Sequence, residues 1–162
     1  MKLKISSFSE EKQIVRSNLT CQQIGLNEEG LTDPVKVEVK VAKSSSCLTV
    51  ECNIEVKTNF HCDRCLDEYD GLLNTKAEFI VTSDTRIKAD SDEIIFISSA
   101  VDEVDISKNI RDAILLAIPY KRICSPQCRG LCPSCGKNLN DGPCDCHDET
   151  IDPRWEKLKN LK

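Results

Sequence analysis

The chain has 162 residues, of which 40% are hydrophobic, and its formal net charge is -5. This size suits one domain with a small appendage, or at most two small domains, and the apolar fraction is sufficient for a core. The charge is uneven, because residues 1–118 carry 14 Lys and Arg against 21 Asp and Glu, whereas residues 119–162 carry 8 against 6. The acidic balance excludes a strongly basic nucleic-acid binder as a description of the whole chain.

The N-terminal residues, MKLKISSFSEEKQ, contain no apolar segment of the signal-peptide type. No run of residues approaches the roughly 20 apolar positions that a membrane span needs. We therefore expect a protein without membrane contact that stays in a reducing cytoplasm. There, clustered cysteines are metal ligands or redox thiols more often than disulfides, and the odd total of 11 cysteines fits poorly with a pure disulfide framework.

The first part of the chain predicts an antiparallel sheet with one wet face. Residues 35–41, VKVEVKV, alternate valine with charged residues, and residues 48–56 repeat this alternation after a serine turn. Residues 2–5 and 77–82 are shorter strand candidates, and residues 93–98, with four consecutive apolar residues, predict a more buried strand. The polar stretch from residue 6 to Glu29 has only weak periodicity and predicts no regular element.

A helix is predicted to begin near Asp105, where apolar residues start to recur every three and four positions. Asp105 or Ser107 would cap its N-terminus and Pro119 would end it. The apolar stripe of this helix would lie across the sheet and close the core. Near the C-terminus, Asp152 and Pro153 begin a second, short helical pattern.

The segment from Cys124 to Cys146, CSPQCRGLCPSCGKNLNDGPCDC, contains six of the 11 cysteines and only two large apolar residues. Ordering a residue costs roughly 1–2 kcal/mol of backbone entropy, so this segment cannot fold on a hydrophobic core of its own. A thiolate-bound metal, worth roughly 10–16 kcal/mol apparent in small zinc modules, would supply the missing stabilisation.

The predicted fold class is therefore α+β. Residues 1–118 form an antiparallel sheet domain with one packed helix, and residues 119–162 form a tail with a cysteine-rich zinc knuckle followed by a short helix.

Four cysteine pairs have the spacing of zinc ligands, because two thiolates two to four residues apart can reach one ion from a tight turn. Our preferred division places them in two structural zinc sites. The local site is Cys132, Cys135, Cys144 and Cys146. The second site, which ties the tail to the sheet, is Cys62, Cys65, Cys124 and Cys128.

The main alternative is one zinc site whose ligands are drawn from the six tail cysteines, with Cys62 and Cys65 free or redox-active. His61 and His147 each adjoin a cysteine pair and are candidates to replace a thiolate, although a solvated histidine is the default. Cys52 is expected to fill the core, and Cys21 and Cys47 lack partners at ligand spacing.

No catalytic constellation is present in the sequence. The zinc-protease, serine-hydrolase, phosphate-loop and dinucleotide motifs are all missing, and zinc with four thiolate ligands leaves no position for a reactive water. We therefore expect no enzyme and no small-molecule substrate. Seven basic residues could form a phosphate-contacting face around the knuckle, although a solvated charged surface is the commoner outcome. They are Lys121, Arg122, Arg129, Lys137, Arg154, Lys157 and Lys159.

The pair CDRCL (62–66) with CSPQCRGLCPSCGKNLNDGPCDC (124–146) resembles the YceD-like family of large ribosomal RNA subunit accumulation proteins. The preceding DISKNIRDAILLAIPYKRIC and the closing DPRWEKLKNLK resemble the same family, so the likeness extends from about residue 47 to the end. It implies a role in the synthesis, processing or accumulation of large-subunit (23S) ribosomal RNA in bacteria or plastids, and it implies no catalytic residues.

The first hypothesis is a non-enzymatic factor of large-subunit biogenesis that contacts the pre-ribosomal large subunit, its rRNA or an early ribosomal protein. The acidic charge favours protein contacts and at most a modest RNA footprint on the tail. A second hypothesis is a redox-responsive zinc protein, a chaperone-like switch that releases zinc on oxidation. A third is a zinc-ribbon adaptor for transcription, which the tail alone would permit.

Overall fold

The computed structural model describes residues 1–9, 12–44, 47–84, 93–98 and 100–146. Within this part of the chain, no helix is long and apolar enough to cross a membrane. The predicted terminal helix from Asp152, together with His147, Arg154, Lys157 and Lys159, lies outside the described residues.

The chain divides into two compact units. The sheet unit comprises Met1–Phe60 and Tyr69–Lys121. The cysteine unit comprises His61–Glu68 together with the residues from Arg122 onward. A short loop in the middle of the sequence therefore belongs to the same unit as the C-terminal cysteines.

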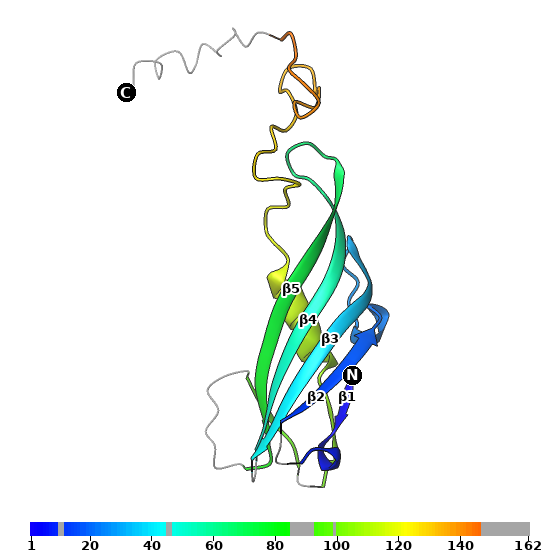
Figure 1. The fold of residues 1–162 in the computed structure, drawn as a ribbon, viewed down its shortest axis with the longest axis vertical. Helices are drawn as coiled ribbons and strands as arrows, with labels where there is room; N and C mark the ends of the chain where they lie inside the picture. Colours follow the sequence, from blue (N-terminus) through cyan, green and yellow to red (C-terminus); the bar gives the residue numbers. More distant parts are fainter. Residues whose placement is uncertain (10–11, 45–46, 85–92, 99, 147–162) are drawn as a thin grey trace, which may run out of the picture. The chain divides into compact units, whose positions relative to one another are not determined.

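A five-stranded sheet forms the body of the sheet unit, in the order β2-β3-β4-β5-β6 (Figure 1). Its strands are β2 (Gln13–Leu19), β3 (Leu31–Ser44), β4 (Cys47–His61), β5 (Glu68–Thr82) and β6 (Ile94–Phe96). The pairs β2–β3 and β3–β4 are antiparallel, whereas β6 runs parallel to the end of β5. The predicted antiparallel sheet is thus present, with one parallel strand at its edge.

The remaining elements belong to the same unit. A two-stranded sheet pairs β1 (Lys2–Lys4) with β7 (Glu103–Asp105), and the single α-helix described is α1 (Ser107–Ala117). Short 3₁₀ turns occupy Ile5–Ser7 and Gln22–Ile24.

One face of the sheet packs on α1, as the alternating pattern predicts. Val35, Val39 and Val41 on β3 are almost fully buried, and so are Val50 and Val56 on β4. On the other side, Ile110 and Ile114 of α1 and the N-cap residue Ile106 are fully buried at helical spacing. Burying a branched aliphatic side chain contributes roughly 1.5–3 kcal/mol, so this layer is the main source of stability in the sheet unit.

The helix begins at Ser107 with Ile106 as its N-cap, so the prediction of Asp105 or Ser107 as the cap was wrong. Asp105 nevertheless contacts the first turn from the position before the cap. The Asp105 carboxylate accepts a hydrogen bond from the Ser107 N–H at 2.9 Å, which satisfies one of the free donors of the first turn. The Ser107 contacts lower the pKa of Asp105 to about 2, because they stabilise its ionised form. The helix ends at Ala117, two residues before Pro119.

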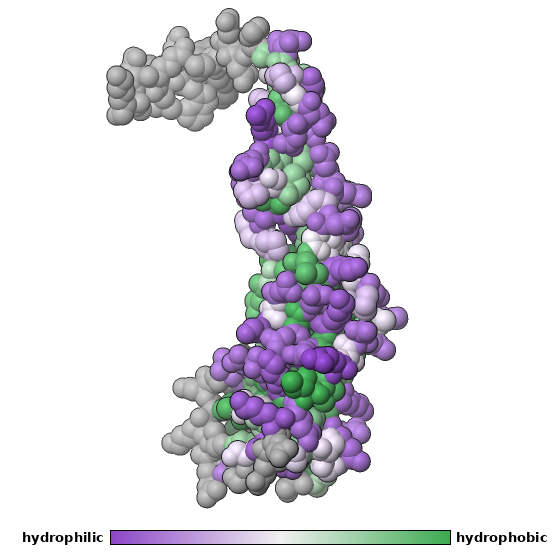
Figure 2. All heavy atoms as spheres, in the orientation of Figure 1, coloured by the Kyte–Doolittle hydropathy of each residue, from purple (hydrophilic) through white to green (hydrophobic). Residues whose placement is uncertain are grey.

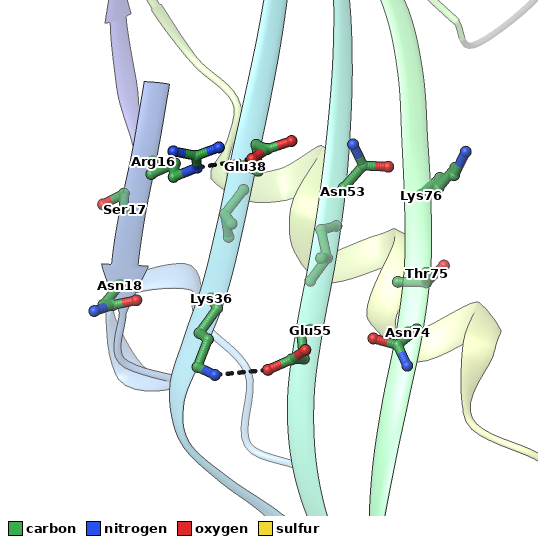
Figure 3. Close-up of a pocket in the computed structure, with 12 residues that line it drawn as sticks. Arg16, Ser17, Asn18, Lys36, Glu38, Asn53, Glu55, Asn74, Thr75 and Lys76 are labelled. Carbon is green, nitrogen blue, oxygen red and sulfur yellow. Dashed lines mark hydrogen bonds and ion pairs between the residues drawn. The ribbon is translucent and has the colours of Figure 1, made fainter. Parts of the chain in front are cut away.

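The other face of the sheet is polar. Arg16 on β2 pairs with Glu38 on β3 at 2.8 Å, and Lys36 pairs with Glu55 on β4 at 2.7 Å (Figure 3). In Figure 3 these side chains lie on the near side of the strands while α1 passes behind them. Figure 2 shows that hydrophilic residues predominate on this face.

The sequence prediction was wrong for several strands. It assigned no element to Gln13–Leu19, which forms β2, and it began β5 at residue 77 instead of Glu68. It also expected residues 93–98 to form a buried strand, whereas β6 has three residues and Phe96 is 45% exposed. Strand β6 is short and partly exposed because it lies at the edge of the sheet and pairs only with the last residues of β5.

Candidate metal centres

Two groups of four cysteine sulfurs lie in the cysteine unit. The first cluster is Cys62, Cys65, Cys124 and Cys128. The second cluster is Cys132, Cys135, Cys144 and Cys146. Within each cluster all four sulfurs lie within 4.8 Å of one another, and all 11 cysteines of the chain are free of disulfides. These are the same two sets of four that the ligand spacing favours.

The sulfur separations in the first cluster fit a tetrahedral ion. Cys62 Sγ lies 3.8 Å from Cys128 Sγ, and Cys65 Sγ lies 3.7 Å from Cys124 Sγ. A tetrahedron with metal–sulfur bonds of about 2.3 Å, the length found for zinc, has sulfur–sulfur edges of about 3.8 Å. The donor set and its spacing therefore fit a zinc ion, and these four thiolates would hold it.

Each cluster begins with the same turn. The Leu66 N–H donates to the Cys62 carbonyl at 2.9 Å, and the Gly136 N–H donates to the Cys132 carbonyl at 2.9 Å. Leu66 and Gly136 both have positive φ, 64° and 74°, so CDRCL and CPSCG close in the same way. The turn curls the backbone around the first sulfur, and the Arg64 N–H lies 3.5 Å from Cys62 Sγ.

Several hydrogen bonds brace the first cluster. The Arg64 guanidinium donates to the Cys128 carbonyl at 2.8 Å, and the Asn140 side-chain amide donates to Cys128 Sγ at 3.3 Å. The Arg64 carbonyl accepts from the Leu131 N–H at 3.1 Å. Gly130 has a positive φ, and a Cβ there would lie 3.0 Å from the Arg64 carbonyl oxygen, so only glycine suits this close approach.

The first cluster is also the more buried of the two. Cys62, Cys65 and Cys128 are at most 5% exposed, and only Cys124 is open to solvent. In the second cluster Cys132 is buried, while Cys135 and Cys146 are exposed. The Lys137 ammonium donates to the Pro143 carbonyl at 2.8 Å and so links the two halves of the second cluster.

The protein environment makes some thiols of the first cluster more acidic than others. Burial acts to raise the pKa of Cys62, but backbone N–H groups from neighbouring residues outweigh it and lower the pKa to about 6. The Asn140 hydrogen bond likewise lowers the pKa of Cys128. The N–H of Asp67 acts to lower the pKa of Cys65, but burial and neighbouring thiols raise it, and burial also raises the pKa of Cys124.

In the second cluster one thiol is acidified. Backbone N–H groups of Cys135 and Ser134 lower the pKa of Cys132 to about 6. Hydrogen bonding with Cys135 raises the pKa of Cys146 to about 12. The Cys146 N–H acts to lower the pKa of Cys144, but a hydrogen bond with Cys132 raises it. Each cluster thus contains at least one thiol with a lowered pKa, and a bound cation would favour the ionised form of the remaining sulfurs.

Among the described residues, none of the remaining candidates joins these clusters. The two ring nitrogens of His61 lie 3.4 Å from the Leu66 carbonyl and 3.8 Å from the Glu68 carboxylate, which fits a surface histidine. Cys52 is fully buried in the sheet core, as expected, and burial raises its pKa to about 12. The residues that sequence reasoning missed are Arg64 and Asn140, which lie within the quoted motifs but act across 64 and 12 residues of sequence.

Comparison with known proteins finds several similar sequences. The chain is 30% identical over 139 residues to an uncharacterised protein of Mycobacterium tuberculosis, which covers 85% of this chain and 65% of that relative. It is 47% identical over 62 residues to a protein of Arabidopsis thaliana, covering 38% of this chain and 19% of the relative. It is 43% identical over 63 residues to a Zea mays protein, covering 38% of this chain and 22% of the relative.

Both plant proteins bear the name large ribosomal RNA subunit accumulation protein YCED homolog 1, chloroplastic. The chain spans less than two thirds of the length of these relatives. No solved structure matches the chain. The family model for large ribosomal RNA subunit accumulation protein YceD matches residues 50–162, a range that contains both clusters. The chain belongs to the YceD family.

Proposed function

We propose that this protein is a non-enzymatic factor that promotes the accumulation of large-subunit (23S) ribosomal RNA and that it holds two structural zinc ions. The observation that carries the proposal is the family match over residues 50–162, which includes β5, α1 and all eight clustered cysteines. The description of the family supports the proposed pathway, biogenesis of the large ribosomal subunit. We further propose that the protein works in the bacterial cytoplasm, a reducing setting that suits free thiols.

The proposed role of the metal is structural. Each cluster offers four thiolates, which fill the four positions of a zinc ion and leave none for substrate or water. When bound, zinc would supply folding free energy to a segment that has few apolar residues. The hydrogen bonds from Arg64 and Asn140 orient the first cluster, since they hold the carbonyl and the sulfur of Cys128.

Charge favours a protein contact of the cysteine unit over an RNA contact. Its described residues include four basic and five acidic side chains. A zinc ion with four thiolates carries a net charge of about -2, so two such centres make this unit strongly acidic. Two of the basic groups, Arg64 and Lys137, donate to backbone carbonyls within the unit. We therefore propose that the partner is a protein of the pre-ribosomal large subunit.

Depletion of the protein in its host tests the proposed function. We expect the ratio of large-subunit to small-subunit ribosomal RNA to fall, with precursor particles visible on a sucrose gradient. Re-expression of the wild-type chain should restore the ratio. An unchanged ratio during normal growth would contradict the proposal.

A charge-reversal series tests the kind of contact. The variants Arg122→Glu, Arg129→Glu and Lys137→Glu change three of the four basic residues in the described part of the cysteine unit, leaving Arg64 in place. If the contact is with protein, co-sedimentation with large-subunit particles should change little across the series. A progressive, salt-dependent loss of co-sedimentation would instead indicate contact with ribosomal RNA.

A second candidate function is supported by the exposure of Cys135 and Cys146. Exposed thiolates are the ones that oxidants reach first, so the second cluster is suited to release its metal under peroxide. A redox-responsive chaperone would then expose apolar surface as zinc leaves. Zinc that stays bound under mild peroxide would argue against this second function.

A further inference from the structure

Most of one edge of strand β5 has no paired strand in the described part of the chain. Strand β5 has 15 residues, but β6 pairs only with Ile80–Thr82 at its end. No strand in the described part of the chain pairs with the same edge of β5 before Ile80. A long open strand edge is a template for an added strand, because its backbone donors and acceptors are already aligned.

The backbone groups that face this edge can be identified from the bonds to β6. The Ile80 N–H donates to the Glu93 carbonyl at 2.8 Å, and the Thr82 carbonyl accepts from the Ile97 N–H at 3.0 Å. Since successive residues of a strand direct their backbone groups to opposite edges, Glu78 and Lys76 direct theirs to the same open edge. Their N–H and C=O groups are therefore available to an incoming strand.

A groove of about 460 Å³ lies beside this edge, between β5 and α1. Phe79 is on its sheet side and Ala113 and Leu116 are on its helix side. Leu116 is 87% exposed, which is unusual for a leucine on a packed helix, whereas Phe79 is buried. The Thr75 hydroxyl donates to the Ala113 carbonyl at 3.4 Å and fixes the helix against the strand at this point.

The rim of the groove is acidic. Glu78, Glu93 and Asp112 line it, and Lys76 is the basic residue among its lining residues. The complementary ligand is a chain segment that alternates apolar and basic side chains. In an added strand, one set of side chains points toward Leu116 and Phe79 while the other set lies on the outer side, near Glu78.

We infer that the β5–α1 groove binds an extended, basic segment of a partner protein by adding it as a strand to the edge of β5. This inference does not depend on the proposed function, since it uses only the sheet unit. The acid rim disfavours a nucleic acid, whose phosphates would lie against three carboxylates.

Fluorescence anisotropy with the full zinc-loaded chain tests the inference. The probe is a labelled ten-residue peptide that alternates lysine and valine, and its control peptide alternates glutamate and valine. The lysine peptide should bind and the glutamate peptide should not. Leu116→Ser should weaken binding at least about tenfold, because a leucine contact is lost. Tyr120→Ser, a fully exposed residue outside the groove, is the matched control and should have no effect.

Charge and backbone variants make the test specific. Glu78→Lys should weaken binding about fivefold and Lys76→Glu should strengthen it, while Glu103→Lys outside the groove leaves it unchanged. Lys76→Pro removes an N–H at the open edge together with a repulsive charge, so a weaker complex than that of Lys76→Ala identifies strand addition. Thermal unfolding confirms that each variant is folded.

Three results would overturn the inference. The first is equal weakening by groove and control variants, which would indicate a non-specific charge effect. The second is a concentration-dependent dimer, seen in sedimentation, that Lys76→Pro dissociates, because the occupant would then be a second copy of this chain. The third is stronger binding of an RNA oligonucleotide than of the lysine peptide, with a further gain in Glu78→Lys.

Discussion

The two cysteine clusters share a turn but differ in their surroundings. In both, the N–H of the fifth residue donates to the carbonyl of the first cysteine at 2.9 Å. In the first cluster three sulfurs are buried and Arg64 and Asn140 contact Cys128, whereas two cysteines of the second cluster are exposed. Ligand spacing sets where a metal can bind, and we expect the packing around the sulfurs to set how firmly it is held.

Replacing one cysteine in each cluster should have the largest effect on zinc content and on local folding. Cys128→Ala and Cys144→Ala should each reduce the zinc content from two ions to one, with a loss on the scale of about 10–16 kcal/mol apparent binding free energy. We expect Cys128→Ala to make both the loop at 61–68 and the segment from 122 protease-sensitive, and Cys144→Ala to expose only residues beyond 132. Elemental analysis and limited proteolysis measure these outcomes. Equal cleavage patterns in the two variants would contradict the difference.

Lowering the pH should release zinc from the two clusters at different pH values. Protons compete with zinc for thiolates, and the lowered pKa values of Cys62 and Cys128 mean that the first cluster has two acidified thiols. The second cluster has one, Cys132, with a pKa of about 6. As the pH falls from 8 toward 5, the second cluster should therefore release zinc at the higher pH. A chromogenic chelator follows the release, and a single step for both ions would contradict the expectation.

Removing the hydrogen bond to sulfur should weaken only the first cluster. Asn140→Ala deletes the donor at 3.3 Å from Cys128 Sγ, and loss of such an outer-shell partner typically lowers metal affinity about 10–100-fold. Asn140→Asp is the matched variant, since it can still accept from the Arg129 N–H but no longer donates to sulfur. Competition with a zinc buffer measures both affinities. An intact first cluster in Asn140→Asp would show that the donor is unimportant.

The smallest expected effect concerns the shared turn. Leu66 has a φ of 64° and its side chain is 64% exposed, whereas Gly136 occupies the same position in the second cluster. A non-glycine residue at this φ costs roughly 1–2 kcal/mol, partly offset by the greater unfolded-state freedom of glycine. Leu66→Gly should therefore stabilise the cysteine unit by up to about 1 kcal/mol, as measured by denaturant unfolding. A clear destabilisation would mean that the leucine side chain makes a needed contact.

The sequence predicted the elements whose signals are local. Valine alternation located β3, the three-and-four spacing located α1, and the cysteine spacing grouped the eight sulfurs. Strand β2 was missed because its exposed edge position tolerates a mixed pattern such as QIVRSNL. The first half of β5 was missed because Gly71 and Asn74 interrupt any alternation, and it is strand only because it lies beside the long β4.

The supporting residues of the clusters could not be predicted in the same way. Arg64 and Asn140 lie inside the cysteine motifs, but their roles depend on which backbone carbonyl and which sulfur the fold brings near them. Arg64 reads as a surface charge within CDRCL until Cys128, 64 residues later, is placed beside it. Likewise, a leucine at position 66 does not by itself predict a positive φ. The equivalent position in CPSCG is Gly136, a residue type that favours this backbone conformation.

The sequence separation within the first cluster affects the entropy of the unfolded chain. Cys65 and Cys124 are 59 residues apart, and the chain between them contains all of β5 and all of α1. A bound ion would act as a reversible cross-link that closes this long loop. By the chain-entropy relation used for disulfides, a loop of this length lowers the entropy of the unfolded chain by the equivalent of about 4 kcal/mol. During synthesis Cys62 and Cys65 are made before Cys124 and Cys128. Zinc would therefore close this loop only after the sheet and helix residues have been made.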